Sequence, residues 1–159
     1  MMRAYVALGS NLGDSRKQLL DAINALADLP HTHLLARSHV YRTPPWGMHD
    51  QPDFLNAVVA LETPLPPHEL LDALLDIERA AGRERKERWG PRTLDLDLLH
   101  VAGKSVNDER LTLPHPHIAE RAFVLLPLNE LAPDLEIPGQ GRVADLLRAV
   151  DTQGCELLA

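Results

Sequence analysis

The order of apolar patterns along residues 5–101 limits the fold more than any other feature of this 159-residue chain. Four short apolar runs are typical of strands, and two longer stretches repeat Leu, Ile and Ala at helical spacing. In chain order they are a strand at 5–8, a helix from 15 to a stop at Pro30, strands at 34–41 and 54–61, a helix at 68–81 and a strand at 93–101. This order predicts an α+β, ferredoxin-like fold, in which helices cover one face of an antiparallel sheet and the other face stays open for a ligand.

Local signals refine the predicted boundaries. Ser15 and Gln18 form a capping-box pattern at the start of the first helix, and Gly82 ends the second helix. The segment 43–53 is rich in Pro and Gly and is longer than a tight turn needs, which makes it a candidate functional loop. The last third of the chain, with apolar residues from Ile118 onward, is expected to be mostly helical.

Composition narrows the classes of partner. The chain has 16 Lys and Arg against 23 Asp and Glu, a net charge of −7, whereas nucleic acids and anionic membranes attract a broad positive field. The single cysteine, Cys155, cannot form an internal disulfide, and the first residues have too short an apolar stretch for a signal peptide. We therefore expect one domain, residues 1–159, that is cytoplasmic and monomeric and binds neither nucleic acid nor membrane.

Two carboxylates share one face of the last predicted strand. Side chains two apart in a strand face the same side at roughly 6.6 to 7 Å, so Asp95 and Asp97 project together while the leucines between and beside them enter the core. Two like charges side by side favour a cation between them, and hard oxygen ligands suit Mg²⁺, whose shell the phosphates of a substrate complete. The alternative is a solvated strand face that forms salt bridges with nearby arginines.

A cluster of positive charge directly precedes this pair. Residues 83–92 carry five basic and two acidic side chains, a charge of +3, which leaves −10 for the rest of the chain. Guanidinium groups bind phosphate oxygens in a forked geometry, so this cluster beside paired carboxylates favours a metal-bound polyphosphate. Gly82 and Gly90 at its ends are typical of a loop that closes on a ligand. The alternative is a solvated charge run at the end of a helix.

Other residues add hints of a ligand. Asn56 shares a strand face with Phe54, an arrangement that suits a planar heterocycle, although a core Phe and an edge Asn are the commoner explanation. His115, close to Arg121 in the sequence, is interpreted either as a phosphate contact or as packing at a helix start. His115 and His117 have no third ligand at zinc spacing, which argues against a zinc site.

Five motifs together resemble the 6-hydroxymethyl-7,8-dihydropterin pyrophosphokinase family of the folate pathway. They are GSNLG at 9–13, YRTPP at 41–45, QPDFLN at 51–56, RWGPRTLDLD at 88–97, and PHP at 114–116 followed by Arg121 and Phe123. The resemblance covers nearly the whole chain in the order of the family, and the fourth motif is highly specific.

The resemblance implies a reaction and a site. The terminal diphosphate of ATP would be transferred to the hydroxymethyl oxygen of 6-hydroxymethyl-7,8-dihydropterin, giving AMP, and the loops near 44–53 and 83–91 would close over the substrates. The implied catalytic residues are Arg83, Arg92, Asp95 and Asp97, of which the two aspartates would hold two Mg²⁺ ions. The implied ATP contacts are Glu78, Arg85, Arg88, Trp89, Leu98, Arg110, His115 and Arg121. The implied pterin contacts are Thr43, Pro44, Trp46, Phe54, Asn56 and Phe123, with the two phenyl rings on opposite sides of the pterin.

Two alternative functions stay open. One is a non-catalytic ferredoxin-like module that binds a nucleotide or RNA, although an RNA-binding face usually carries net positive charge. The other is an ordinary kinase that moves only the γ-phosphate. AMP release from Mg-ATP that depends on the added pterin would distinguish the three, because the kinase would give ADP and the module would give neither product.

Overall fold

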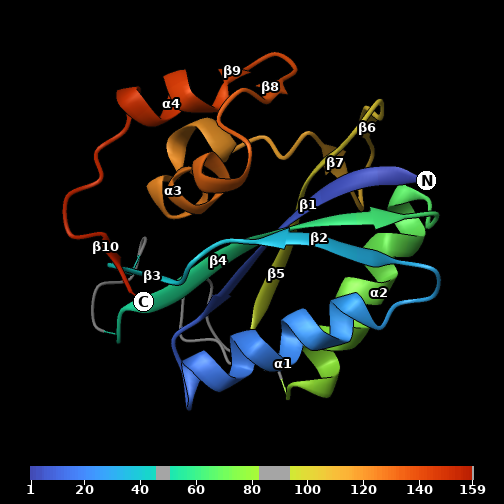
Figure 1. Cartoon of the computed structure of the whole chain (residues 1–159), viewed down its shortest axis with the longest axis horizontal. Helices are drawn as coiled ribbons and strands as arrows, with labels where there is room; N and C mark the ends of the chain where they lie inside the picture. The colour runs from blue at the N-terminus through green and yellow to red at the C-terminus, as the bar shows by residue number, and fades with distance from the viewer. Residues whose placement is uncertain (46–50, 83–93, 159) are drawn as a thin grey trace.

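The computed structural model describes residues 1–45, 51–82 and 94–158 of the chain (Figure 1). An antiparallel sheet with the strand order β10-β3-β4-β1-β5 forms its centre, and β2 also pairs with β4. The strands of this sheet are β1 (Met2–Ser10), β2 (His33–Arg37), β3 (Tyr41–Thr43), β4 (Phe54–Thr63), β5 (Asp95–Val101) and β10 (Glu156–Leu157). The helices α1 (Ser15–Ala27) and α2 (Pro67–Ala80) connect them in the order predicted for a ferredoxin-like fold, which is confirmed.

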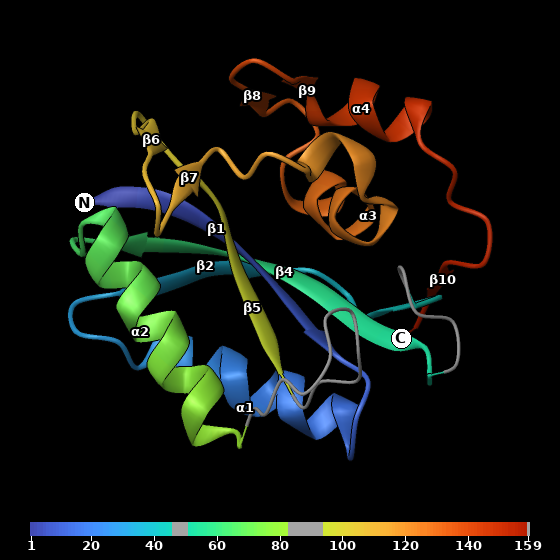
Figure 2. The same cartoon turned by 180° about the vertical axis from the view of Figure 1, so that it is seen from behind.

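Helices α1 and α2 cover one face of the sheet, as Figures 1 and 2 show from opposite sides. Their apolar stripes bury an almost purely aliphatic cluster, with Leu8 from β1, Leu26 from α1, Leu74 from α2 and Leu96 from β5 each at most 6% exposed. An aliphatic core is what a chain with so few aromatic residues predicts.

The start of α1 differs from the prediction. Asp14 is the N-cap, because its carboxylate accepts a hydrogen bond from the Lys17 N–H at 3.2 Å. Ser15 lies inside the helix, and its hydroxyl accepts a hydrogen bond from Ser10 Oγ at 3.2 Å. Asp and Ser cap helices about equally well, so the residue type could not decide between neighbouring positions. The end of α2 is as predicted, with Gly82 at φ +77°, where a side chain would cause strain.

The strand predicted at 34–41 is two strands, β2 and β3, separated by residues 38–40. At this break the Ser38 N–H donates to the Val58 carbonyl, and the Ser38 hydroxyl accepts from the Val58 N–H, both at 2.9 Å. A side-chain oxygen thus replaces a backbone carbonyl in the ladder, and the chain leaves regular pairing before it re-forms it at β3.

The second face of the sheet is not open along its whole length, which corrects the expectation of helices on one face only. Helices α3 (Ala122–Leu131) and α4 (Val143–Ala149) lie on the side opposite α1 and α2 (Figures 1 and 2). They contribute to a second buried cluster that includes Val58 of β4, Leu99 of β5 and Leu128 of α3. Central strands with apolar side chains on both faces need cover on both sides.

The C-terminal third is less helical than expected. Besides α3 and α4 it contains the short helical turn Ile118–Glu120, the hairpin of β8 (Glu136–Ile137) and β9 (Gly141–Arg142), and β10. A second small hairpin, of β6 (Val106–Asn107) and β7 (Thr112–Leu113), follows β5. Among the described helices, none combines the length and the apolar character that a bilayer crossing requires.

Candidate functional site

A pocket lies on the second face of the sheet, beside the part that α3 and α4 cover. It encloses about 630 Å³ of space that atoms do not fill, part of which opens to solvent. The residues that line it are Ala7, Leu8, Gly9, Thr43, Pro44, Phe54, Asn56, Asp95, Asp97, Arg121 and Phe123. Eight of these belong to the predicted site, so the structure brings together residues from β3, β4, β5 and the start of α3 that are up to 80 positions apart in the sequence.

The carboxylates of Asp95 and Asp97 face this pocket from β5. The leucines that alternate with them, Leu94, Leu96 and Leu98, belong to the core on the other face, as predicted. Opposite the two aspartates, β1 places Gly9 and Ala7, whose small size leaves the space above the carboxylates unfilled.

Asp97 pairs with a guanidinium from the other wall of the pocket. Its Oδ2 lies 3.7 Å from Arg121 Nη1, and the side chains are 34% and 12% exposed, respectively. An arginine pairing of Asp97 was part of the solvated-face alternative, but here both partners line a pocket instead of a flat solvated surface.

The donor set at this end of the pocket fits Mg²⁺. Within the described ranges, no group of three or more His, Cys, Asp or Glu side chains could enclose a metal ion. The two neighbouring carboxylates are donors of the kind that suits Mg²⁺, which is commonly held by one or two carboxylates while water and substrate phosphates complete its octahedral shell.

The other end of the pocket is aromatic and amide in character. Asn56 is 5% exposed, and its Nδ2 donates to Thr43 Oγ1 at 2.5 Å, so β3 orients the carboxamide on β4. Phe54 lies on the same face of β4 two residues earlier and pairs in register with Thr43. A Cβ atom added to Gly9 would lie 3.0 Å from Asn56 Oδ1, so a side chain there would push this carboxamide by a few tenths of an ångström.

The start of α3 supplies the facing wall. The guanidinium carbon of Arg121 lies 5.5 Å from the centre of the Phe123 ring, which is a cation–π distance. Arg121 is the residue that precedes α3, and Phe123 lies in its first turn. One short segment therefore supplies both a positive charge close to Asp97 and an aromatic ring to the wall of the pocket.

His115 lies close to this site without lining it. Its backbone N–H donates to the Leu99 carbonyl at 2.8 Å, and its Nδ1 accepts from the His117 N–H at 3.1 Å. Burial lowers the pKa of His115 to about 4, with help from the positive charges of Arg121 and His117 and against the opposing effect of Asp95. The imidazole is therefore neutral near pH 7, and with Nδ1 as acceptor its proton lies on Nε2.

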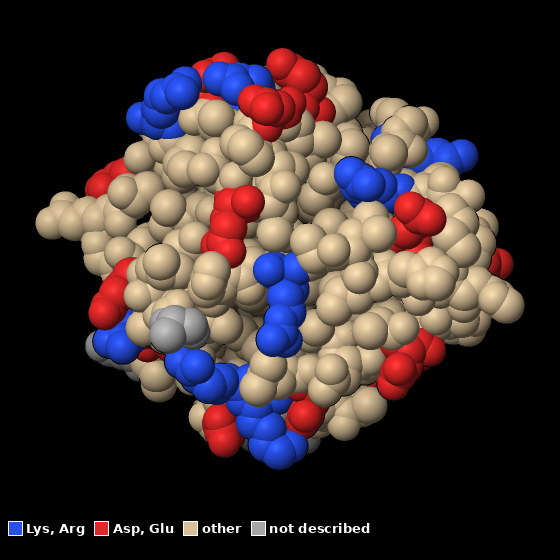
Figure 3. All heavy atoms as spheres, in the orientation of Figure 1, with Lys and Arg blue, Asp and Glu red and all other residues tan. Residues whose placement is uncertain are grey.

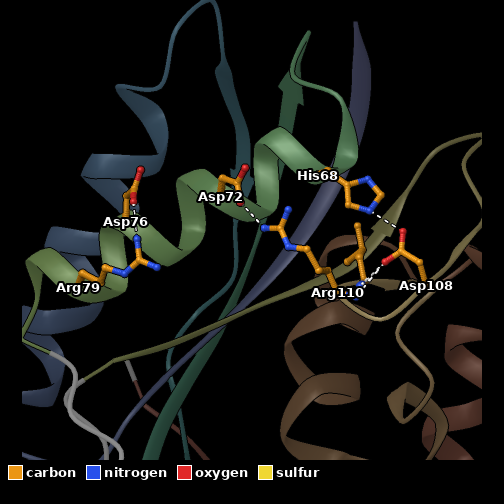
Figure 4. A network of polar contacts seen from close by, with 7 residues as sticks. His68, Asp72, Asp76, Arg79, Asp108 and Arg110 are labelled. Atoms are coloured by element: carbon orange, nitrogen blue, oxygen red, sulfur yellow. Dashed lines mark hydrogen bonds and ion pairs between the residues drawn. The ribbon is translucent and has the colours of Figure 1, made fainter.

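Three predicted nucleotide contacts lie away from the pocket lining. Glu78 is 4% exposed at the end of α2, where its Oε2 accepts from the Leu96 N–H at 2.7 Å. Leu98 is buried in the core on the other face. Arg110, in the connection between β6 and β7, forms an ion pair with Asp72 of α2, beside the His68–Asp108 contact (Figure 4).

Six further predictions fall outside the described residues: Trp46, Arg83, Arg85, Arg88, Trp89 and Arg92.

Sequence reasoning missed the contribution of β1 and the turn after it. GSNLG contributes to the family resemblance but none of its residues to the predicted site, yet its first residue, Gly9, lines the pocket. Asn11 is 3% exposed, and its Nδ2 donates to Gln51 Oε1 at 2.8 Å and to the Pro52 carbonyl at 2.9 Å. A polar residue in a turn gave no signal that its partners lie 40 positions further along the chain.

Comparison with known proteins identifies a family. The sequence model of the 7,8-dihydro-6-hydroxymethylpterin-pyrophosphokinase (HPPK) family matches residues 5–133. The 2-amino-4-hydroxy-6-hydroxymethyldihydropteridine pyrophosphokinase of Methylorubrum extorquens is 53% identical over 156 residues, which cover 98% of each chain. A protein of the same name from Pseudomonas aeruginosa is 49% identical over 158 residues, which cover 99% of this chain and 98% of that one.

Solved structures share the fold. The HPPK-DHPS of Plasmodium falciparum with SDX-DHP aligns with a TM-score of 0.70 at 15% identity, over 93% of this chain and 43% of that one. An HPPK-DHPS in complex with substrates aligns with a TM-score of 0.75 at 13% identity and the same coverage. This chain thus spans less than half the length of those proteins, and at such identity the likeness shows the fold alone. The family match and the close relatives of nearly equal length show more: the chain belongs to the HPPK family.

Proposed function

We propose that the chain transfers the terminal diphosphate of ATP to the hydroxymethyl oxygen of 6-hydroxymethyl-7,8-dihydropterin in the pocket between β5 and α3, and releases AMP. Membership of the HPPK family supports a pyrophosphokinase of folate biosynthesis. The observation that supports this pocket as the place of the reaction is that aromatic and amide side chains line it together with charged ones. A planar heterocycle that receives a diphosphate on a short arm needs both kinds of group in one pocket.

At the aromatic end we expect the pterin to lie between Phe54 and Phe123, one ring from the sheet and one from α3. The Asn56 carboxamide, oriented by Thr43, then faces the hydrogen-bonding edge of the heterocycle. Pro44 closes the side of the pocket. Trp46, from the same predicted set, would complete the pterin contacts.

At the charged end, Asp95 and Asp97 would hold two Mg²⁺ ions, and Arg121 would bind phosphate oxygens. The bound ions would neutralise phosphate charge and polarise the transferred group. Transfer of a diphosphate needs charge neutralisation and in-line placement more than a covalent intermediate. The carboxylates and the guanidinium are pre-oriented by β5 and by the Phe123 ring, so little reorganisation is needed at the moment of reaction.

The remaining nucleotide contacts are proposed from the family resemblance. Arg83 and Arg92 would act on the transferred group, with Arg85, Arg88 and Trp89 on the nucleotide. His115, neutral and with its proton on Nε2, would donate a hydrogen bond to a phosphate oxygen, in keeping with its lowered pKa. The separation of Glu78, Leu98 and Arg110 from the pocket lining is compatible with contacts to the adenine and ribose, which lie farthest from the reacting phosphate.

One product assay tests the reaction. AMP should accumulate from Mg-ATP only when 6-hydroxymethyl-7,8-dihydropterin is added, and Asp97→Ala should lower turnover by at least roughly a thousandfold while the fold is retained by circular dichroism. Asp76→Ala, on the exposed face of α2, is the matched control that keeps activity. ADP as the product would indicate γ-phosphate transfer, and no nucleotide product would favour a binding module. Near-normal activity of Asp97→Ala at saturating Mg²⁺ would remove the metal role.

A binding experiment tests the stacking. Phe123→Ala should weaken pterin affinity by roughly tenfold or more, on the scale of an aromatic contact, and ATP affinity by much less. Isothermal titration calorimetry with each ligand measures both. Equal losses for the two ligands would contradict the assignment of Phe123 to the pterin.

We further propose a cytoplasmic monomer formed by one domain, residues 1–159. Its single cysteine fits a reducing compartment. On the face seen in Figure 3, Lys and Arg side chains gather in a narrow band from the middle to the lower edge with acidic side chains beside it, which is less than the broad basic surface that a nucleic acid attracts. Light scattering coupled to size-exclusion chromatography tests the monomer, for which the expected mass is 17.6 kDa.

A further inference from the structure

The C-terminal residues run along the outer edge of β3. Strand β10 pairs antiparallel with β3, with Glu156 opposite Arg42 and Leu157 opposite Tyr41. The Leu158 N–H donates to the Val40 carbonyl at 2.8 Å and extends this pairing by one residue. Figures 1 and 2 both show β10 beside β3, far from the hairpins that precede it.

The same segment reaches the pocket wall. A Cβ atom built on Gly154 would lie 3.3 Å from Cγ of Pro44, so this glycine packs directly behind the proline that lines the pocket. Gly154 has φ +86°, a conformation that favours glycine at this point. Its backbone can therefore approach the proline more closely than that of any residue with a side chain.

Burial of apolar surface does not explain this segment. Leu157 is 58% exposed, and in the described part of the chain neither buried cluster includes a residue beyond Val150. The family sequence model also stops at residue 133, well before β10. The segment instead contacts β3 and the residues on either side of it. It pairs with β3 by backbone hydrogen bonds, donates to the Val40 carbonyl, forms the Arg42–Glu156 ion pair at 3.5 Å and packs against Pro44.

Strand β3 is the part of the sheet on which such contacts have most effect. It is three residues long and separated from β2 by a break, so in the described sheet β4 would be its one remaining strand neighbour if β10 were absent, beside the hydrogen bond from the Tyr41 hydroxyl to Glu130 of α3. Its last residue, Thr43, accepts the hydrogen bond that orients Asn56, and Pro44 follows directly. A small shift of β3 would therefore move one wall of the pocket and release the carboxamide at the same time.

We propose that the C-terminal segment 154–158 is a positioning element of the substrate pocket, which holds Thr43 and Pro44 against β4 and thereby raises affinity for the heterocyclic substrate. The proposal rests on the proposed function of the pocket. It assigns no chemistry to the segment, which acts only through β3.

The first test compares two glycines with the same backbone strain. Gly154→Ala adds a methyl group that presses on Pro44, whereas Gly139→Ala, at φ +78° with nothing within 4 Å of the added atom, carries the strain alone and lies in the β8–β9 turn. Both variants should lose similar stability. Only Gly154→Ala should raise the Kd and KM for the pterin, by roughly fivefold, with the Kd for ATP and kcat at saturating pterin little changed.

The second test removes one hydrogen bond. Leu158→Pro deletes the N–H that donates to Val40, and Leu158→Ala keeps that N–H while it shortens the side chain. Leu158→Pro should weaken pterin binding by roughly fivefold, the scale of one lost hydrogen bond, and Leu158→Ala by clearly less. A role confined to stability would move the melting temperature and leave the pterin Kd unchanged at low temperature.

The outcomes separate this proposal from the proposed function. If Phe123→Ala and Asn56→Ala weaken pterin binding while Gly154→Ala and Leu158→Pro do not, the pocket assignment holds and the positioning role is overturned. If Phe123→Ala and Asn56→Ala leave pterin binding unchanged, the pocket assignment itself is wrong. Equal effects of Gly154→Ala and Gly139→Ala would also overturn the positioning role, because backbone strain alone would then explain them.

Discussion

Gly9 affects the pocket because it has no side chain. It lies on β1 opposite Asp95 of β5, and a Cβ atom there would lie 3.0 Å from Asn56 Oδ1. Contacts this short force a neighbour to move, and the neighbour is a buried carboxamide already held by Thr43. The sequence could show a glycine next to a turn, but not that Asn56 on the neighbouring strand β4 lies opposite it and requires it.

Gly9→Ala should therefore weaken pterin affinity by roughly tenfold, a loss of about 1.4 kcal/mol, because the added methyl group displaces the Asn56 carboxamide. ATP affinity should change little. Calorimetric titration of both ligands measures the two effects. A double-mutant cycle supplies the control: in an Asn56→Ala background the cost of Gly9→Ala should largely disappear. An undiminished cost would trace the effect to something other than the carboxamide.

At the scale of elements, one carboxylate ties α3 to the β2–β3 connection. Glu130 Oε1 accepts from the His39 N–H at 2.9 Å and lies 2.6 Å from His39 Nδ1, and Oε2 accepts from the Tyr41 hydroxyl at 2.8 Å. Burial alone would raise the pKa of Glu130, but these hydrogen bonds outweigh it and hold the pKa below the ordinary 4.5. Burial, the hydrogen bond to Glu130 and its charge raise the pKa of Tyr41 to about 12, so the tyrosine stays a donor.

Glu130→Gln should lower the free energy of unfolding at pH 7 by roughly 1 kcal/mol, because an amide cannot accept all of these bonds. A carboxylate with a lowered folded-state pKa contributes stability above its unfolded pKa and loses it as the pH falls through the folded value. The difference between wild type and variant should therefore be constant at neutral pH and shrink below pH 4.5. Urea unfolding at several pH values measures it. Tyr41→Phe, which keeps the carboxylate and its bonds to His39, should retain the pH dependence, and a pH-independent difference would contradict the role of the charge.

The order of the elements could be predicted because it depends on local periodicity. The alternation of apolar and polar residues over 93–101 and the helical spacing of apolar residues over 68–81 depend only on residues close together in the sequence. The structure confirms both elements, with shifts of one or two residues at their ends. The break at Ser38 and the cap at Asp14 depend on which backbone groups come within reach, Val58 in one case and Lys17 in the other. The aspartate pair was visible in the sequence for the same local reason, whereas Gly9 and Asn11 acquire their roles only through distant partners.

The whole molecule is a sheet between two separate buried clusters. One is shared with α1 and α2, and the other with α3 and α4. Both clusters reach the pocket, since Leu8 of the first cluster lines it, but only the second supports its α3 wall, because Phe123 packs against that cluster and lines the pocket. Stability can thus be lost from either face, but substrate affinity should depend on the face that holds α3 in place.

Cavity-forming substitutions, one in each buried cluster, separate the effect on stability from the effect on substrate affinity. Leu128→Ala in α3 and Leu70→Ala in α2 each truncate a fully buried leucine, so both should lower the free energy of unfolding by about 2–5 kcal/mol. Only Leu128→Ala loosens the helix that carries Arg121 and Phe123, so at a temperature where both variants are folded it alone should weaken pterin binding, by roughly threefold or more. Chemical denaturation and calorimetric titration of the same samples measure both quantities. Equal losses of affinity would mean that the pocket responds to stability in general, whichever face of the sheet supplies it.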